Sequence, residues 1–141
     1  MQESAGARAA LLRFYEAFTA AAPGDLDGFE RVFSREQDLL VIGTAAHEWV
    51  DSRDKGTRSW GAEGVAIEPG EPKAWEQDSV AWAVDRPSFV FGEVRMPIRI
   101  LVVLLKEDGD WKIASAHFSV GVPDEVAAEH AVEWSELPAA H

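Results

Sequence analysis

The segment Met96–Lys106 limits the possible folds more than any other part of the chain. It is apolar at almost every position, and Arg99 is its only charged residue before Lys106. A strand with one face in solvent shows apolar residues only at alternate positions, so continuous apolarity predicts a strand covered on both faces. A second strand, Trp111–Val122, follows the turn Glu107–Gly109. Together these segments predict a β-hairpin whose outer side is covered.

The N-terminal part of the chain shows helical patterns. Apolar residues recur at helical spacing and predict a first helix over residues 4–22, which ends at Pro23–Gly24. Asp25 is placed to cap a second short helix. Asp51 or Ser52 is placed to cap a third. Three helices therefore precede most of the strands.

The remaining patterns complete an α+β domain. Short apolar or alternating runs predict strands at Leu39–Ile42, Val65–Ile67 and Val80–Val84, and residues 124–136 predict a short, solvated, acidic terminal helix. Helices followed by strands predict a cone-shaped α+β fold, with the helices on one face of a curved, mostly antiparallel sheet. The length of 141 residues fits one domain over residues 1–141.

Composition excludes several classes of function. The formal net charge of −12 repels phosphate backbones and anionic lipids, so we expect neither nucleic acid nor a membrane as partner. The absence of cysteine removes disulfides, thiolate zinc sites and cysteine nucleophiles, and it fits a cytoplasmic protein. No signal peptide pattern or membrane-spanning run is evident.

Several segments resemble the nuclear transport factor 2-like superfamily, and within it the SnoaL-like branch. The likeness lies in Gly24–Phe29, Asp38–Thr44, Val80–Trp82 and Asp108–Ile113, the last leading to His117–Ser119. The resemblance implies three helices against a strongly curved sheet, a cavity between them, and a homodimer through the sheet's outer face. It implies no single activity, because the superfamily holds isomerases, cyclases, dehydratases and binding proteins.

The resemblance allows the ketosteroid isomerase reaction to be tested residue by residue. That chemistry needs a carboxylate base and an oxyanion hole made by a tyrosine and a protonated acid. Gly43–Thr44 stands where the base would lie, and Ile98–Leu105 contains no Asp or Glu. Tyr15, the only tyrosine, has an offset that differs from the isomerase pattern. Steroid isomerisation is therefore not expected.

The hairpin turn determines which side chains share a face of the sheet. A two-residue turn pairs Arg99 with Phe118, whereas a three-residue turn closed by a left-handed glycine pairs Arg99 with His117. We favour the three-residue turn, which turns Leu101, Val103 and Leu105 toward the helices. In that register Arg99, Ser115, His117 and Ser119 line the far end of the cavity.

Two of these residues are candidates for ligand binding or chemistry. Arg99 is a candidate clamp for a carboxylate, because its planar fork binds two oxygens at once. Its alternatives are an ion pair with Asp85 or a place in a dimer interface. His117 is a candidate general acid or base, and the alternative is a hydrogen-bonded lining residue.

Aromatic residues supply the other candidates. Tyr15 is a second candidate acid–base group, although its ring has an alternative role in packing. The side chains of Trp49, Trp60 and Trp82 are candidates for the floor of the cavity, or for the core. The histidines lack metal-binding spacing and no phosphate loop is present, so we expect no metal and no cofactor.

These observations leave open whether the protein is an enzyme. The first hypothesis is a homodimer that binds a small, possibly anionic, organic ligand in the cavity, with Arg99 and Ser119 among its contacts. The alternative is a cofactor-free lyase, isomerase or cyclase that uses His117 and Tyr15 as acid–base groups. A third hypothesis is a dimerisation module whose own side chains fill the cavity.

Overall fold

The structure is a computed structural model that describes residues 1–138. Its helices are α1 (Ala5–Ala20), α2 (Leu26–Val32), α3 (Arg53–Ser59) and α4 (Asp124–Ser135). Its strands are β1 (Gln2–Glu3), β2 (Leu40–Ile42), β3 (Trp49–Val50), β4 (Ala66–Glu68), β5 (Lys73–Gln77), β6 (Val80–Asp85), β7 (Ser88–Phe91), β8 (Val94–Pro97), β9 (Arg99–Glu107) and β10 (Asp110–Ser119).

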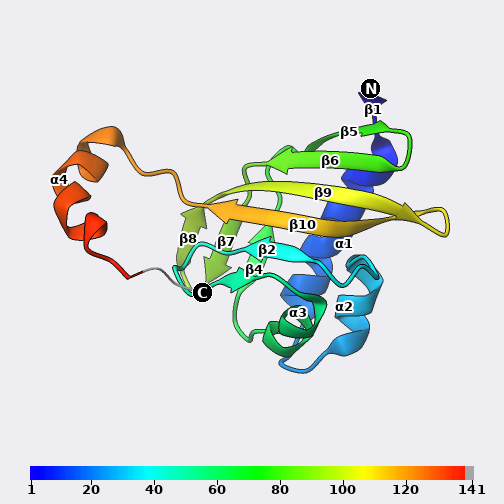
Figure 1. The fold of residues 1–141 in the computed structure, drawn as a ribbon, viewed down its shortest axis with the longest axis horizontal. Helices are drawn as coiled ribbons and strands as arrows, with labels where there is room; N and C mark the ends of the chain where they lie inside the picture. Colours follow the sequence, from blue (N-terminus) through cyan, green and yellow to red (C-terminus); the bar gives the residue numbers. More distant parts are fainter. Residues whose placement is uncertain (139–141) are drawn as a thin grey trace.

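Two sheets and three N-terminal helices form the body of the molecule. The larger sheet has the strand order β1-β5-β6-β9-β10-β2-β3, and the smaller one has the order β4-β7-β8. All pairs are antiparallel except β10 with β2. Figure 1 shows α1 crossing one face of the larger sheet, with α2 and α3 beside its lower end. The predicted α+β fold is confirmed.

The caps that the sequence indicated begin the short helices. The carboxylate of Asp25 accepts a hydrogen bond from the backbone N of Gly28 at 3.0 Å, at the start of α2. The hydroxyl of Ser52, rather than Asp51, accepts one from Lys55 at the start of α3. The first helix begins one residue later than predicted because Ser4 is its cap.

Strand β9 divides its apolar residues between the two faces of the sheet. Ile100, Val102 and Leu104 are at most 3% exposed and lie on the face that α1 covers. Leu101 is 47% exposed on the opposite face, with Val103 half-buried beside it. Within residues 1–138 no helix covers that outer face, which stays largely apolar.

The hairpin register differs from the predicted one. Asp108 and Gly109 both have positive φ, 52° and 86°, and form a two-residue turn between Glu107 and Asp110. Such a turn matches the right-handed twist of the strands, and Asp-Gly is a preferred sequence for it. The even-numbered residues of β9 therefore face the helices, and the three-residue prediction is wrong.

A β-bulge in β10 changes the face of every later residue in that strand. Ile113 pairs with Leu104, but Ser115 pairs with Val103, so Ala114 is an extra residue. Before the bulge odd-numbered residues face the helices, and after it even-numbered residues do. His117 consequently faces outward.

Several short strands were not predicted. Strand β5 lies between the predicted strands at Val65–Ile67 and Val80–Val84, and β7 and β8 form a hairpin around Gly92. Strand β10 ends at Ser119, three residues earlier than expected. These strands are short or lie at sheet edges, where apolar alternation is weak.

Helix α4 agrees with the prediction of a solvated acidic helix. It stands apart from the body in Figure 1, and none of its residues is buried. The linker Val120–Pro123 carries it away from the end of β10. No helix in the described part of the chain combines the length and apolar content needed to cross a membrane.

Candidate functional site

An aromatic cavity of about 360 Å³ lies between the three N-terminal helices and the sheets. Its walls come from α1, α2, α3, β2, β3, β7 and β10 and from the segments between them. Most of the lining is aromatic: Phe14, Phe18, Phe29, Phe33, Trp60, Phe89 and Phe118. The cavity predicted between helices and sheet is therefore present.

The rings of the wall pack against one another in tilted and edge-on arrangements. Phe33 and Trp60 meet edge to face, with centroids 5.5 Å apart and an interplanar angle of 86°. Phe29 stacks on Phe33 at 4.4 Å, and Phe14 lies 6.0 Å from Phe118. Such pairs stabilise the wall by about 1 kcal/mol each beyond their buried area. The aromatic cluster, these seven lining rings, forms an apolar chamber.

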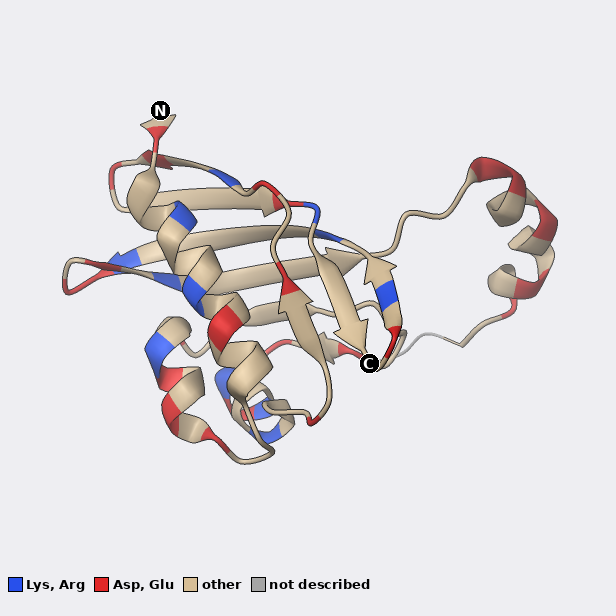
Figure 2. Cartoon of the chain, turned by 180° about the vertical axis from the view of Figure 1, so that it is seen from behind, with Lys and Arg blue, Asp and Glu red and all other residues tan. Residues whose placement is uncertain are grey.

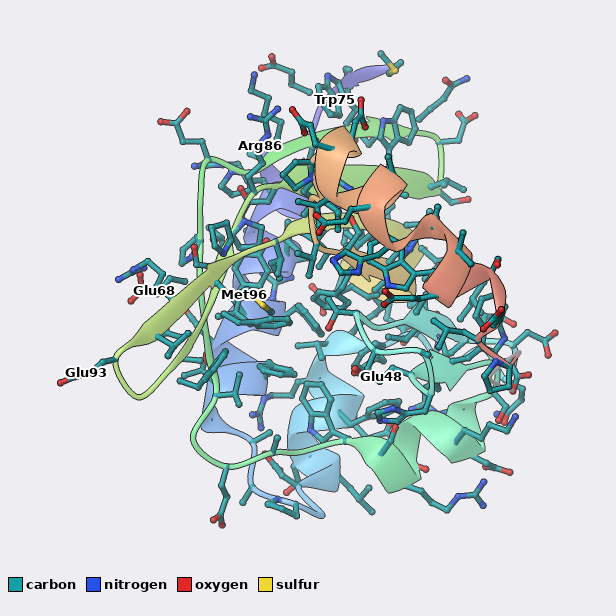
Figure 3. All side chains as sticks on the ribbon, turned by 90° about the vertical axis from the view of Figure 1, so that its left-hand side faces the viewer. Glu48, Glu68, Trp75, Arg86, Glu93 and Met96 are labelled. Atoms are coloured by element: carbon teal, nitrogen blue, oxygen red, sulfur yellow. The ribbon has the colours of Figure 1, made fainter. Side chains whose placement is uncertain are left out.

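Polar residues occur at the edge of the cavity. Thr44, His47 and Glu48 come from the loop between β2 and β3, and all three are exposed. Figure 3 shows the labelled Glu48 on this loop. Its carboxylate accepts a hydrogen bond from the backbone N of Ala45 at 3.0 Å. The cavity thus has an apolar interior and a polar rim.

Sequence reasoning did not identify this rim. His47 and Glu48 were considered only as metal ligands, and no local pattern marks a loop as the edge of a cavity. Within residues 1–138 no group of three His, Asp or Glu side chains is placed to hold a metal ion. Thr44 lines the cavity at the position where an isomerase would carry its base.

The indole of Trp60 carries the one polar side-chain atom, among the described residues, that is buried without a hydrogen-bond partner. Trp60 is 8% exposed, lines the cavity and contacts Phe14, Phe18, Phe29 and Phe33. A buried N–H without an acceptor costs about 1–3 kcal/mol. The atom is closed off from the cavity space in this structure, so a ligand reaches this donor only if the indole turns toward the apolar chamber.

The other two candidate tryptophans lie elsewhere. Trp49 is 44% exposed and pairs with Ile42, whereas its neighbour Val50 lines the cavity from the inner face. Trp82 lies between the buried Ala81 and Ala83 and therefore points to the outer face. Of the three, only Trp60 lies in the cavity wall.

Arg99, His117 and Ser119 lie on the outer face, not in the cavity. Arg99 and Ser119 are directly opposite each other, and the Arg99 Nε donates a hydrogen bond to the Ser119 Oγ at 3.1 Å. His117 is exposed and opposite Leu101. The predicted placement of these residues in the cavity is wrong, because the two-residue turn and the bulge reverse the face on which they lie.

Tyr15 is a buried core residue. It is 2% exposed, and its hydroxyl donates a hydrogen bond to Asp85 Oδ2 at 2.8 Å. Burial first, and then the hydrogen bond and the negative charge of Asp85, raise the pKa of the Tyr15 phenol far above its ordinary value. His117 lies across the sheet from this core. The two predicted acid–base groups therefore share no cavity.

Asp85 is satisfied without an ion pair from Arg99. The backbone N of Arg86 donates to Oδ1 at 2.8 Å, and that of Gly70 donates to Oδ2 at 3.0 Å. A Cβ at residue 70 would collide with the carbonyl oxygen of Arg86, so only glycine allows the loop this close to the carboxylate. The predicted alternative of an Arg99–Asp85 pair is wrong.

Comparison with known proteins agrees with this geometry. The SnoaL-like domain family matches residues 8–123. The chain belongs to the SnoaL-like family. Within this SnoaL-like domain the match begins in the first turn of α1, extends past β10 and ends before α4. No curated protein sequence matches the chain.

Solved structures show the same fold at low sequence identity. A candidate dehydratase of the NTF2-like family from Streptomyces avermitilis has a TM-score of 0.72 and 16% identity, over 84% of this chain and 95% of that one. A cystatin-like protein from Caulobacter vibrioides scores 0.66 at 16% identity, over 91% and 96%. A candidate ketosteroid isomerase from Shewanella frigidimarina scores 0.62 at 16% identity, over 82% and 96%. These likenesses show the NTF2-like fold alone.

The contact between Tyr15 and Asp85 makes a testable contribution to stability. Tyr15→Phe keeps the ring and removes one of three donors to a buried carboxylate, so we expect the free energy of unfolding to fall by about 2 kcal/mol at neutral pH. Because the phenol pKa is raised in the folded state, the wild type is fully stabilised below the ordinary pKa of 10.0 and loses stability as the pH rises above it. Tyr15→Phe has no phenol, so its free energy of unfolding lacks this dependence on pH. Urea unfolding of the wild type and Tyr15→Phe at pH values below and above 10.0 measures the two free energies of unfolding.

A spectroscopic control is available because the chain has one tyrosine. Tyrosinate absorbance reports Tyr15 alone and should appear only as the protein unfolds. Titration of folded protein with an ordinary phenol pKa would contradict the buried contact.

Proposed function

We propose that this SnoaL-like protein binds a small, uncharged, largely apolar molecule in the aromatic cavity. The single observation that carries the proposal is a cavity of about 360 Å³ lined by seven aromatic rings. Ligand sites are concave and mostly apolar, and about 300–1,000 Å³ is their usual size. The volume is at the lower end of that range, which favours a ligand of one or two rings.

The charge of the lining supports a neutral ligand. No Lys or Arg lines the cavity, and its ionisable residues, His47 and Glu48, are exposed at the rim. The expectation of an anionic ligand depended on Arg99, which lies outside the cavity. Burial of an unpaired carboxylate among phenyl rings costs far more than burial of a neutral group.

The Trp60 indole supports a ligand with one hydrogen-bond acceptor. Its Nε1–H is buried and has no partner in the described structure. A carbonyl or ether oxygen on the ligand satisfies that donor, whereas a hydrocarbon leaves it unpaired. The proposed ligand is therefore an aromatic or alicyclic ketone, ester or ether.

The outer face of the sheet supports a homodimer. Trp82, Val84, Leu101 and Val103 lie next to one another on β6 and β9, and no described helix covers them. Exposed apolar patches of this kind mark interaction sites. We propose that two copies of the chain bury these faces against each other.

The structure offers less support for the enzymatic alternative. A proton transfer needs its acid and base within hydrogen-bond reach of one substrate, and Tyr15 and His117 lie on different sides of the sheet. Binding without chemistry therefore remains the proposal for the cavity, with no metal or cofactor expected.

A cavity-filling substitution tests the binding site. Val41 lines the cavity, and Val41→Phe is expected to weaken binding of 2-acetylnaphthalene at least tenfold, because the added ring occupies the space of the ligand. Val94→Phe, on the exposed strand β8, is the matched control and should bind as the wild type does. Calorimetric titration measures both. Absence of wild-type binding, or equal binding by Val41→Phe, would contradict the proposal.

A second pair of measurements tests the indole donor. We expect the wild type to bind 2-acetylnaphthalene about five- to tenfold more tightly than 2-ethylnaphthalene, because only the ketone accepts a hydrogen bond. Trp60→Phe keeps an aromatic wall, removes the donor and should abolish the preference. The Trp60 indole proton, assigned by its loss in Trp60→Phe, should move downfield in NMR spectra with the ketone alone. The anion 2-naphthoate should bind more weakly than the ketone.

The dimer is tested by sedimentation. The wild type is expected to sediment as a dimer at micromolar concentration, and Leu101→Glu as a monomer, since it places a charge in the buried face. Val94→Glu, on the exposed β7–β8 hairpin, is the control and should remain dimeric. A monomeric wild type would refute the proposed interface.

A further inference from the structure

We propose that α4 of one protomer docks on the outer sheet face of a second copy, over the end of the sheet that carries Arg99. The inference rests on the homodimer proposed above and names the element that extends its interface. It commits to a second copy because α4 leaves its own body and covers none of it (Figure 1).

Helix α4 has an apolar side without a partner. Val126, Ala127, His130 and Trp134 fall on one side of the helix at the spacing of helical turns, and none of its residues is buried. His130 and Trp134 stack there at 5.7 Å. A short helix of this kind gains most of its stability from packing its apolar side.

Every charged residue of α4 is acidic. The helix carries Asp124, Glu125, Glu129 and Glu133 and no Lys or Arg, and Figure 2 shows red segments and no blue along it. Within residues 1–138 the one side-chain hydrogen bond of these acids joins Glu133 Oε2 and His130 Nδ1, at 3.3 Å. The helix therefore suits a surface that is apolar and basic.

The sheet offers such a surface at one end. Lys73, Arg86 and Arg99 line a single depression where β6 ends and β9 begins. Two acids share its lining: Asp85, whose carboxylate already accepts three hydrogen bonds, and Glu71, so the cations exceed the acids there by one. These three cations, the basic end of the sheet, form no ion pair within the described chain. The basic end adjoins the apolar outer face of β6 and β9, so an apolar helix with acidic edges fits it in both respects.

The path of the chain brings α4 to this end. Ser119, the last residue of β10, is paired with Arg99, so the linker Val120–Pro123 leaves the sheet beside the basic end. Figure 3, viewed from this side, shows α4 in front of the sheet. In a two-fold dimer through the outer faces, each helix reaches the partner's sheet from the rim of the interface.

Two complementary full-length variants distinguish docking of α4 on a second copy from packing of α4 on the sheet of its own chain. The sheet variant is Lys73→Glu with Arg99→Glu, and the helix variant is Glu129→Lys with Glu133→Lys. Each alone places like charges together, so we expect its dimer dissociation constant to rise at least tenfold. Mixed in equal amounts, they should form a heterodimer close to the wild type in affinity, because each helix then meets a sheet of opposite charge.

The control variant has the same net charge as the helix variant, but its two lysines lie away from α4. Glu63→Lys with Glu93→Lys carries the same charge as the helix variant but lies in a loop and in the β7–β8 turn, and it should dimerise as the wild type does. On the helix itself, Trp134→Ala should weaken the dimer and Val132→Ala, 74% exposed on the other side, should not.

Sedimentation velocity on each sample gives the result. Dimers of unchanged affinity in both charge variants, or no recovery on mixing, would overturn the docking of α4 and leave the sheet dimer in place. A monomeric wild type would overturn both proposals.

Discussion

The central strand β9 is apolar on both faces, and the rest of the structure depends on how those faces are buried. Helix α1 covers the face that carries Ile100, Val102 and Leu104, and this contact builds the core. The other face, with Leu101 and Val103, has no cover in the described chain. A strand of this kind is normally buried on both sides, so we expect a second layer of protein to cover the outer face.

The cavity follows from the shape of the aromatic side chains on the covered side. Rings that meet edge to face, such as Phe33 and Trp60, make strong contacts but leave space between them. The space lies at the end of α1, where α2, α3 and β7 close around it. Its interior is apolar, and our proposal of a neutral ligand with one acceptor depends on that lining and on the indole N–H of Trp60.

Charge is distributed unevenly over a strongly acidic protein. The buried Asp85 accepts three hydrogen bonds, from Tyr15 and two backbone N–H groups, and forms no ion pair with Arg99 in the described chain. Arg99 lines the same depression as Lys73 and Arg86, whereas the charged residues of α4 are all acidic. The ionisable residues of the cavity lie at its rim, and our proposal assigns the charged groups of the outer surface to contact with a second copy of the chain.

The sequence by itself determined the fold class, the helices and the strands β2, β4, β6, β9 and β10, because helix and strand periodicities and caps such as Asp25 are local properties. It also placed Trp60 among the candidates for the cavity. Only the tertiary structure decided which face each hairpin residue occupies. Side chains alternate with a period of two, so the two-residue turn at Asp108–Gly109 turned Arg99 outward, and one extra residue, Ala114, did the same for His117.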